Sequence, residues 1–364
     1  MLRWMDGFEH YGALAHALEG VGGAAAWSQI DEAWTLSTAN PATGTHHLRL
    51  TSNVGFGFSD LIRRPVGQSK QVTGMGYRFA VTDLPVAEED SMNSGVYLSL
   101  LQWHDVANAQ QIRVNLGTEG SVRALIGNTE IDRSDPCVAA GGYHHFEGKA
   151  KIDNTTGYCE IRINEVTVLN LTGIDTQATA NAECSQFRVM SSQQLADHVE
   201  LTMDLDDAFV WDDDASDPEN TIIDFVGDKG CYYLPVDADT TEADWLLSAG
   251  VTGYELLDET TVNTGDYIYD NTGVARSLFG VAALPANVAE VLAMQPVLYA
   301  RKEESGTVTL RGGVHVNGQE SYTPDNSPST EYAYMTPGPK TIDPDTGAAW
   351  ATNADPQLLI ERTA

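Results

Sequence analysis

Short runs in which hydrophobic and polar residues alternate dominate this chain. Clear examples are residues 75–81, 96–103, 111–116 and 121–126, and turn-rich gaps such as 117–120 separate the later ones. Alternation with a period of two gives a strand one face for a core and one for solvent, and closely spaced short strands are typical of a sandwich or barrel. Helical periodicity is scarce: residues 10–20 fit a short helix, but their glycines favour a loop as readily. The pattern predicts an all-β fold.

Two separated segments, 143–173 and 200–213, fit one antiparallel sheet. Alternating runs in the first are interrupted at 153–157 and 163–165, where Asn, Asp and Gly favour turns. In the second, the run 208–211 (AFVW) follows the acidic run 204–207. We expect 208–211 to be a closing strand that returns to the same sheet.

The segments YHHFEGKAKID, TTGYCEIRINEVTVLNLTG and LDDAFVWD resemble the concanavalin A/laminin G-like jelly roll. Where that family has a tight Asn-Gly turn, this chain has Asn164-Glu165. A glutamate tolerates positive φ poorly, so we expect the type I′ turn to be less secure than in the family.

The chain also resembles structural proteins of tailed bacteriophages, through LRWMDGFEHYG at residues 2–12, the join at 205–245 and IDPDTGAAW at 342–350. This resemblance implies a non-enzymatic virion component, assembled in the host cytoplasm, that acts as a tail fibre, tail tip or spike. Its partners would be other virion proteins, copies of itself in a homo-oligomer, and a host surface glycan. A capsid decoration or head-fibre protein is one alternative. A carbohydrate-binding or carbohydrate-processing protein on the same scaffold is another, because fold does not fix function.

A length of 364 residues suits two domains. The polar segment 212–220, which contains Pro218, reads as a linker. We therefore expect a jelly-roll β-sandwich over residues 1–215 and a smaller β domain over 221–364. The second domain contains strand-like runs at 267–269, 297–301, 308–311 and 314–316, and Gly-Gly or Glu-Ser-Gly turns are expected to join the last of these.

The charge of the chain limits its partners. It carries 52 acidic and 20 basic residues, a net charge of −32, and the acidic residues are scattered over the sequence. We expect a solvated acidic surface without nucleic-acid binding, which needs a basic patch. No apolar run approaches the roughly 20 residues that span a bilayer, so no membrane insertion is expected. The start has charges at once and does not read as a secretory signal. The four cysteines form no C-x-x-C pair and are expected to be free thiols.

Candidate chemistry in the sequence is sparse. In the acidic loop starting at Asp212, an EF-hand register fails because its sixth position is Asp217 and its twelfth is Ile223. Calcium at Asp204, Asp206 or Asp207 stays open, although a solvated acidic loop is favoured. No other cofactor is expected.

Neither a glycosidase nor a metal motif is evident. No E-x-D-x-x-E pattern places paired carboxylates on one strand, so hydrolysis is not expected, although acids from separate strands remain open. His144 and His145 are adjacent on a strand, so they point to opposite faces and do not easily share a metal. Trp103 is expected in the core. Tyr332 and Tyr334 are candidates for contact with a glycan or a partner.

Overall fold

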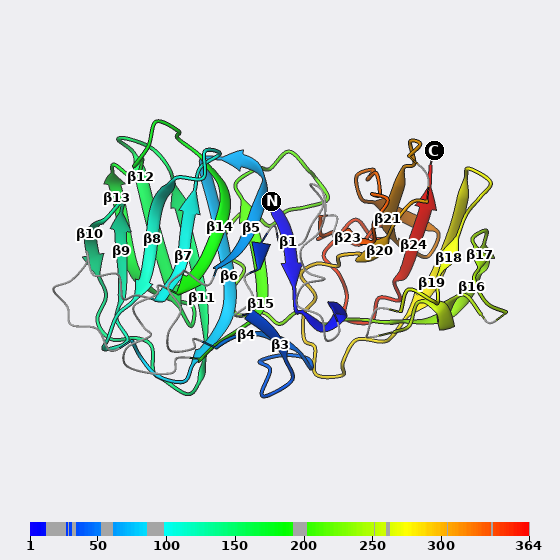
Figure 1. The fold of residues 1–364 in the computed structure, drawn as a ribbon, viewed down its shortest axis with the longest axis horizontal. Coiled ribbons are helices and arrows are strands. Elements are labelled where there is room, and N and C mark those ends of the chain that lie inside the picture. Colours follow the sequence, from blue (N-terminus) through cyan, green and yellow to red (C-terminus); the bar gives the residue numbers. More distant parts are fainter. Residues whose placement is uncertain are drawn as a thin grey trace.

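The computed structural model has two groups of strands side by side: a large sandwich and a smaller C-terminal part that contains the end of the chain (Figure 1). It describes residues 1–11, 27, 29–30, 34–51, 61–85, 98–191, 202–250, 252–259, 263–303, 305–335 and 338–363. In these residues nearly all of the regular structure is β, and the short exceptions among them are the 3-10 turns η1 (Glu9–Tyr11) and η4 (Tyr254–Leu256). The all-β prediction is confirmed. Beyond η1, the segment in which a short helix was weighed (12–20) lies outside the described residues.

The sandwich consists of two antiparallel sheets. Sheet I has the order β13-β12-β11-β6-β15-β4-β3, with β1 also paired to β15. Its strands are β1 (Leu2–Asp6), β3 (Trp34–Ser37), β4 (His47–Thr51), β6 (Val72–Val81), β11 (Tyr143–Lys151), β12 (Gly157–Ile163), β13 (Val166–Ile174) and β15 (Thr202–Asp212). Sheet II has the order β10-β9-β8-β7-β14-β5-β2. Its strands are β2 (Gln29–Ile30), β5 (Leu61–Lys70), β7 (Leu98–His104), β8 (Gln110–Leu116), β9 (Val122–Ile126), β10 (Thr129–Arg133) and β14 (Cys184–Ser191).

Side chains from the facing sides of the two sheets form the main core. Trp103 of β7 is fully buried and would meet a Cβ at Gly148 of β11, so it fills the space between the sheets as expected. The predicted closing strand 208–211 is the end of β15, which pairs with β6 on one side and with β1 and β4 on the other. It therefore lies in the middle of sheet I.

The turn at Asn164-Glu165 forms despite the missing glycine. Both residues have positive φ, 51° and 65°, and they connect β12 to β13. The Asn164 side chain accepts a hydrogen bond from the His145 amide at 2.9 Å, and the Asn164 amide donates to the His145 carbonyl at 2.8 Å. These contacts to β11 hold the turn, so the expected weakness is offset by neighbouring backbone.

The C-terminal part has one five-stranded sheet and two short ribbons. The sheet has the order β16-β19-β24-β21-β22, and the ribbons are β17-β18 and β20-β23. The strands are β16 (Val236–Ala243), β17 (Leu246–Leu247), β18 (Ile268–Tyr269), β19 (Ala275–Val281), β20 (Leu298–Ala300), β21 (Leu310–Val316), β22 (Gln319–Tyr322), β23 (Ala333–Met335) and β24 (Gln357–Arg362). The expected Gly-Gly turn is absent: Gly312 and Gly313 lie inside β21 and pair with β24. A Cβ would be crowded at both positions: at Gly312 it would lie 3.2 Å from Pro296, and at Gly313 2.9 Å from the Ser321 carbonyl oxygen and 3.1 Å from Leu359.

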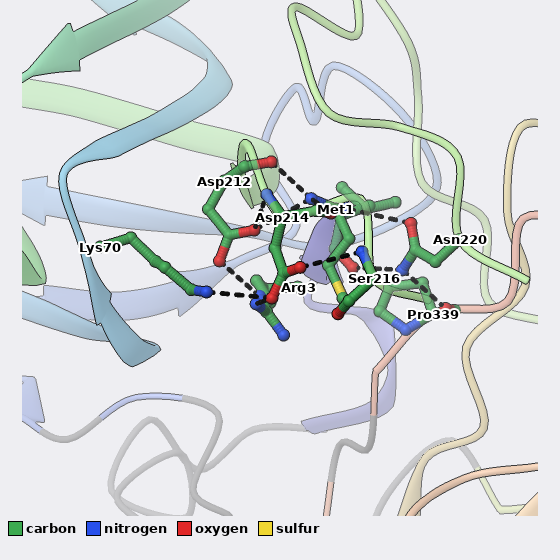
Figure 2. A network of polar contacts seen from close by, with 9 residues as sticks. Met1, Arg3, Lys70, Asp212, Asp214, Ser216, Asn220 and Pro339 are labelled. Atoms are coloured by element: carbon green, nitrogen blue, oxygen red, sulfur yellow. Dashed lines mark hydrogen bonds and ion pairs between the residues drawn. The ribbon is translucent and has the colours of Figure 1, made fainter. Parts of the chain in front are cut away.

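The first strand, the end of β15 and the C-terminal part meet in one polar network (Figure 2). Asp212 accepts from the Met1 amino group at 2.9 Å and from Arg3 Nε at 2.6 Å. The Asn220 side chain donates to the carbonyls of Leu2 (2.6 Å) and Pro339 (3.2 Å). The segment expected to be a linker is therefore hydrogen-bonded to β1 at Asp212 and Asn220, and at Asn220 also to the C-terminal part. The division at 215 and 221 falls between β15 and β16 and stays a prediction.

Candidate functional site

The outer face of sheet II, turned away from the core, carries a set of polar side chains that alternation places together. In β7 and β8, Leu101, Trp103, Ile112 and Val114 belong to the core. The residues between them, Gln102, Gln111, Arg113 and Asn115, therefore point outward. Gln102, Arg113 and Asn115 are only 2%, 6% and 6% exposed. A polar sheet face that is this well buried is unusual for an ordinary solvated surface.

One row of this face crosses neighbouring strands. Gln102 of β7 is in register with Arg113 of β8 on one side and with Arg188 of β14 on the other. The row continues from Arg113 to Leu125 of β9 and then to Glu130 of β10. Adjacent strands lie about 4.8 Å apart, so Arg113 and Arg188 flank Gln102 on the two neighbouring strands.

A second row adds another arginine. Asn115 of β8 is in register with Arg123 of β9 and Ser99 of β7, and Arg123 is in register with Arg133 of β10. Glu130 lies 3.0 Å from Arg133 Nε and 3.9 Å from Arg123. Arg113, Arg123, Arg133 and Arg188 thus share one face of a chain that has 20 basic residues in all. We call the set Gln102, His104, Arg113, Asn115, Arg123 and Arg188 the arginine face.

His104 lies at one end of the arginine face, on the same side of β7 as Gln102. Its Nε2 is 2.8 Å from Gln102 Oε1, and its Nδ1 is 3.2 Å from the Asn108 carbonyl. The carbonyl can only accept, so Nδ1 carries a proton, and a neutral ring then has Nε2 as its acceptor. The Gln102 atom placed next to Nε2 is Oε1, and the amide oxygen and nitrogen exchange places by a half-turn of the amide, so that in this tautomer the NH₂ group is the one that donates to Nε2.

The loop next to His104 is fixed by Asp105. Burial acts to raise the pKa of Asp105, but hydrogen bonds from the Ala109 amide, Asn181 and Thr179 lower it below its ordinary value. The two side-chain bonds, from Thr179 and Asn181, measure 2.8 Å and 2.9 Å. Asp105 therefore stays ionised and has a structural role. On the two described rows of the arginine face, the carboxylate that lies beside the arginines is that of Glu130.

This arrangement suits anion recognition better than two-carboxylate hydrolysis. Arginines bind carboxylate or sulfate groups through paired N–H donors, most strongly where water is excluded. Glycoside hydrolysis requires two carboxyl groups about 5–10 Å apart across the bond. The described rows offer guanidinium, amide and imidazole groups instead.

Each of the three calcium candidates already contacts a different group of the protein. Asp204 is held by Arg49 Nε at 2.6 Å and lies 3.2 Å from His47, which lowers its pKa although burial opposes this. Asp206 accepts from the amides of residues 42 and 43, and burial together with the neighbouring charge of Asp207 raises its pKa to about 8. Asp207 pairs with Arg78 at 2.8 Å. Among the residues that the structure describes, no group of three or more His, Cys, Asp or Glu is arranged to hold a metal ion.

The two tyrosine candidates differ in exposure. Tyr334 is 3% exposed. The centroid of its ring lies 4.8 Å from that of Tyr11 and 4.7 Å from that of Tyr299. Tyr332 is half-buried and stacks on Tyr299 at 5.1 Å, with Arg301 4.8 Å from its ring centre. Tyr334 is therefore covered by protein, and Tyr332 keeps the prediction of glycan contact.

No described helix is long and apolar enough to cross a membrane.

The comparisons with known proteins concern the fold. No family model and no curated protein sequence matches the chain. Among solved structures, a sialidase is similar over 60% of this chain and 19% of its own, with 11% identity and a TM-score of 0.42. Alginate lyase vAL-1 from Chlorella virus is similar over 54% and 97%, with 12% identity and a TM-score of 0.40. Lectin I from Ulex europaeus is similar over 50% and 92%, with 8% identity and a TM-score of 0.31.

These similarities support the jelly-roll sandwich and correct one expectation. The expectation that this chain is not an enzyme is corrected to this extent: the similar structures include a sialidase and alginate lyases, so the fold is one that enzymes use. The similarity to a sialidase, alginate lyases and a lectin concerns the fold of this chain. A place in a virion, homo-oligomerisation and a host glycan as partner stay predictions.

Proposed function

We propose that this chain binds an acidic polysaccharide on the arginine face and cleaves it there by β-elimination. The proposal rests on the chain's own side chains. Its main support is the row formed by Arg188, Gln102 and Arg113 on three neighbouring strands. Arginines gathered on one sheet face of a chain with net charge −32 attract an anionic ligand that the rest of the surface repels.

The reaction class follows from the groups that accompany the arginines. β-Elimination removes the proton next to a uronate carboxylate, forms a carbon–carbon double bond and expels the glycosidic oxygen, which takes up a proton. Arg113 and Arg188 would hold the carboxylate and stabilise the charge that develops on it. His104, with Nδ1 donating to Asn108, would use Nε2 to take the proton. Gln102 would position His104 and the carboxylate.

The test separates binding from cleavage. The full-length protein is incubated with a panel of soluble polysaccharides: uronate polymers, sulfated polymers and neutral glucans. Binding is measured by calorimetry at two salt concentrations, and cleavage by the ultraviolet absorbance of the unsaturated product. We expect binding to the acidic polymers that weakens with salt, and absorbance only with a uronate polymer.

Two variants sharpen this test. His104→Gln is expected to abolish the ultraviolet signal and to retain binding, whereas Arg113→Ala with Arg188→Ala is expected to lose both. Equal binding to neutral and acidic polymers would overturn the anionic ligand. Binding without any unsaturated product from a uronate polymer would overturn the reaction and leave a binding protein.

A further inference from the structure

The outer face of sheet I is covered by a segment without regular secondary structure. Residues 222–231 contain no helix or strand, and Ile222, Phe225 and Val226 pack on Leu2, Phe209 and Trp211. The segment belongs to the connection between the sandwich and the C-terminal part. We call residues 222–231 the covering segment.

The covering segment has two fully buried polar anchors, Glu147 of β11 and Asp207 of β15. The Glu147 side chain accepts the amides of Val226 at 2.7 Å and Gly227 at 3.1 Å through its Oε1. Its Oε2 has no hydrogen-bond partner among the described residues. The other end is held by Asp207, which accepts the Cys231 amide at 2.6 Å.

The other polar contacts of the segment lie at the surface: the Asp228 amide donates to the exposed Glu165, and Asp224, Asp228 and Lys229 form ion pairs. Lys149 reaches Asp224 at 2.8 Å and Arg78 reaches Asp228 at 2.7 Å, but the side chains of Asp224 and Asp228 are 62% and 46% exposed. Such pairs contribute little to stability. The hydrogen bonds to Glu147 therefore have a large share in keeping the segment in place.

Polar groups under the covering segment lack partners. His145, next to Glu147 on the same face of β11, is 2% exposed, and neither of its ring nitrogens has a hydrogen bond among the described residues. Its ring stacks on Phe209, 6.0 Å between centroids. Burial lowers the pKa of His145 to about 4, so the ring stays neutral. A buried polar group without a partner is costly, and water would satisfy these atoms if the segment lifted.

We propose that the covering segment is a lid over the outer face of sheet I, with the Glu147 carboxyl as its latch: the lid is closed while this carboxyl is protonated and opens when it ionises. Opening would uncover His145, Phe209 and Trp211. A neutral carboxyl is tolerated in this dry position, whereas a carboxylate requires water or a cation.

The direction of the pH dependence follows from linkage. Burial raises the pKa of Glu147 to about 7, and the amides of Val226 and Gly227 and the charge of Arg162 oppose it. Because the pKa is higher with the lid closed, closure is fully favoured below the ordinary glutamate range, near pH 4.5, and is weakened as the pH rises to 7. The titratable and charged groups around this carboxyl are Arg78 from β6, His145 and Lys149 from β11, Arg162 from β12, Glu165 from the following turn, and Asp224 and Asp228 from the lid itself.

Hydrogen exchange of the full-length protein tests the lid directly. The protection factor of the peptide that contains Val226 and Gly227, with exchange corrected for its intrinsic pH dependence, is followed from pH 5 to pH 8. We expect protection to fall roughly tenfold per pH unit up to about pH 7 and then to level off. A peptide from β12 reports on the sandwich and is expected to keep its protection.

Two variants test the latch. Glu147→Gln keeps an oxygen for the two amides and cannot ionise, so the protection of the lid should no longer depend on pH. Glu119→Gln removes an exposed carboxylate from the turn between β8 and β9 of the other sheet, and it should keep the wild-type pH dependence. Constant lid protection in the wild type from pH 5 to pH 8 would overturn the proposal. So would a pH dependence that survives in Glu147→Gln, and the wild-type series decides alone if that variant does not fold.

Discussion

His104 Nε2 lies 2.8 Å from Oε1 of Gln102, two residues earlier on the outer face of β7. This contact connects the imidazole to the row of arginines on β8 and β14. The same glutamine is in register with Arg113 and Arg188, so one amide touches the histidine and lies between two guanidinium groups. Gln102 is therefore suited to position His104 rather than to react.

Gln102→Leu is the first prediction, and it follows from this positioning role. Leucine retains the volume but leaves Nε2 of His104 without its partner. The cost of an unsatisfied buried group is about 1–3 kcal/mol, so we expect a ten- to hundredfold loss of kcat with a smaller change in KM. Gln102→Glu is the informative companion: it keeps the length of the side chain, has no N–H to donate to Nε2 and adds a negative charge, so it should also weaken binding of the acidic polymer. A loss confined to KM in Gln102→Leu would contradict the positioning role.

Arg113→Lys tests whether the arginines bind an anion through paired donors. Lysine keeps the charge but not the planar fork, so we expect affinity for an acidic polysaccharide to fall about tenfold and its salt dependence to persist. Calorimetry at two salt concentrations measures both. Lys151→Ala, which removes a charge from the end of β11 in the other sheet, is the control and should bind as the wild type. An equal loss in both variants would indicate a general charge effect.

Much of the fold could be predicted from the sequence, because alternation is a local signal. The runs that became β6, β8, β9 and the end of β15 were all visible as alternating segments. Gln111, Arg113 and Asn115 were also visible, as polar residues at every second position of one run. That signal was sufficient to suggest a polar outer face on this strand.

The neighbours of each strand could not be predicted in the same way. Arg188 joins Gln102 only because β14 enters sheet II beside β7, and a single sequence does not contain that pairing. The prediction of a turn at Gly312-Gly313 is wrong for a related reason: two glycines favour a turn locally, but here they lie inside a strand where Pro296 and the Ser321 carbonyl leave little room for a Cβ. Tertiary contacts decided both cases.

Glu9 is expected to make stability depend on pH. Burial, followed by the neighbouring charge of Asp206, raises the pKa of Glu9 to about 9. The folded state thus holds a proton that the unfolded state releases, so this contribution is complete below about pH 4.5 and is lost as the pH rises to 9. Glu9→Gln cannot ionise and should therefore lack this decrease in the free energy of unfolding. We expect the free energy of unfolding of the wild type, relative to Glu9→Gln, to fall by up to about 1.4 kcal/mol per pH unit in this window. Denaturant unfolding of both proteins at pH 5, 7 and 9 measures this difference. The same pH dependence of the free energy of unfolding in the two proteins would contradict the prediction.

Gly44 and Gly347 form a matched pair for close packing. Both have φ of +65°, but a Cβ at Gly44 would lie 1.8 Å from the Glu9 carboxylate, whereas a Cβ at Gly347 has no atom within 4 Å. Alanine at either position costs the backbone strain of positive φ, about 1–2 kcal/mol. Gly44→Ala should cost about 1–3 kcal/mol more, because Glu9 must move. If thermal unfolding shows the same decrease in stability for Gly44→Ala and Gly347→Ala, the loop around Gly44 adapts to the added Cβ without further cost.

Tyr334 joins the C-terminal part to the sandwich, and its removal should weaken that junction. It extends from β23 into the main core, between Tyr11 and Tyr299, and its hydroxyl donates to the His10 carbonyl at 3.1 Å. Tyr334→Ala leaves a cavity, for which large aromatic residues typically cost about 3–5 kcal/mol, whereas Tyr334→Phe loses one hydrogen bond, about 1 kcal/mol.

The control for Tyr334 is its neighbour Tyr332, which stacks on the same Tyr299 from a half-buried position. Tyr332→Ala should cost less than Tyr334→Ala in denaturant unfolding, because less of its ring is removed from water. If Tyr332 contacts a glycan, its variant should lose that binding at nearly full stability. Equal destabilisation by the two alanine variants would mean that the stacked ring is as important for the junction as the inserted one.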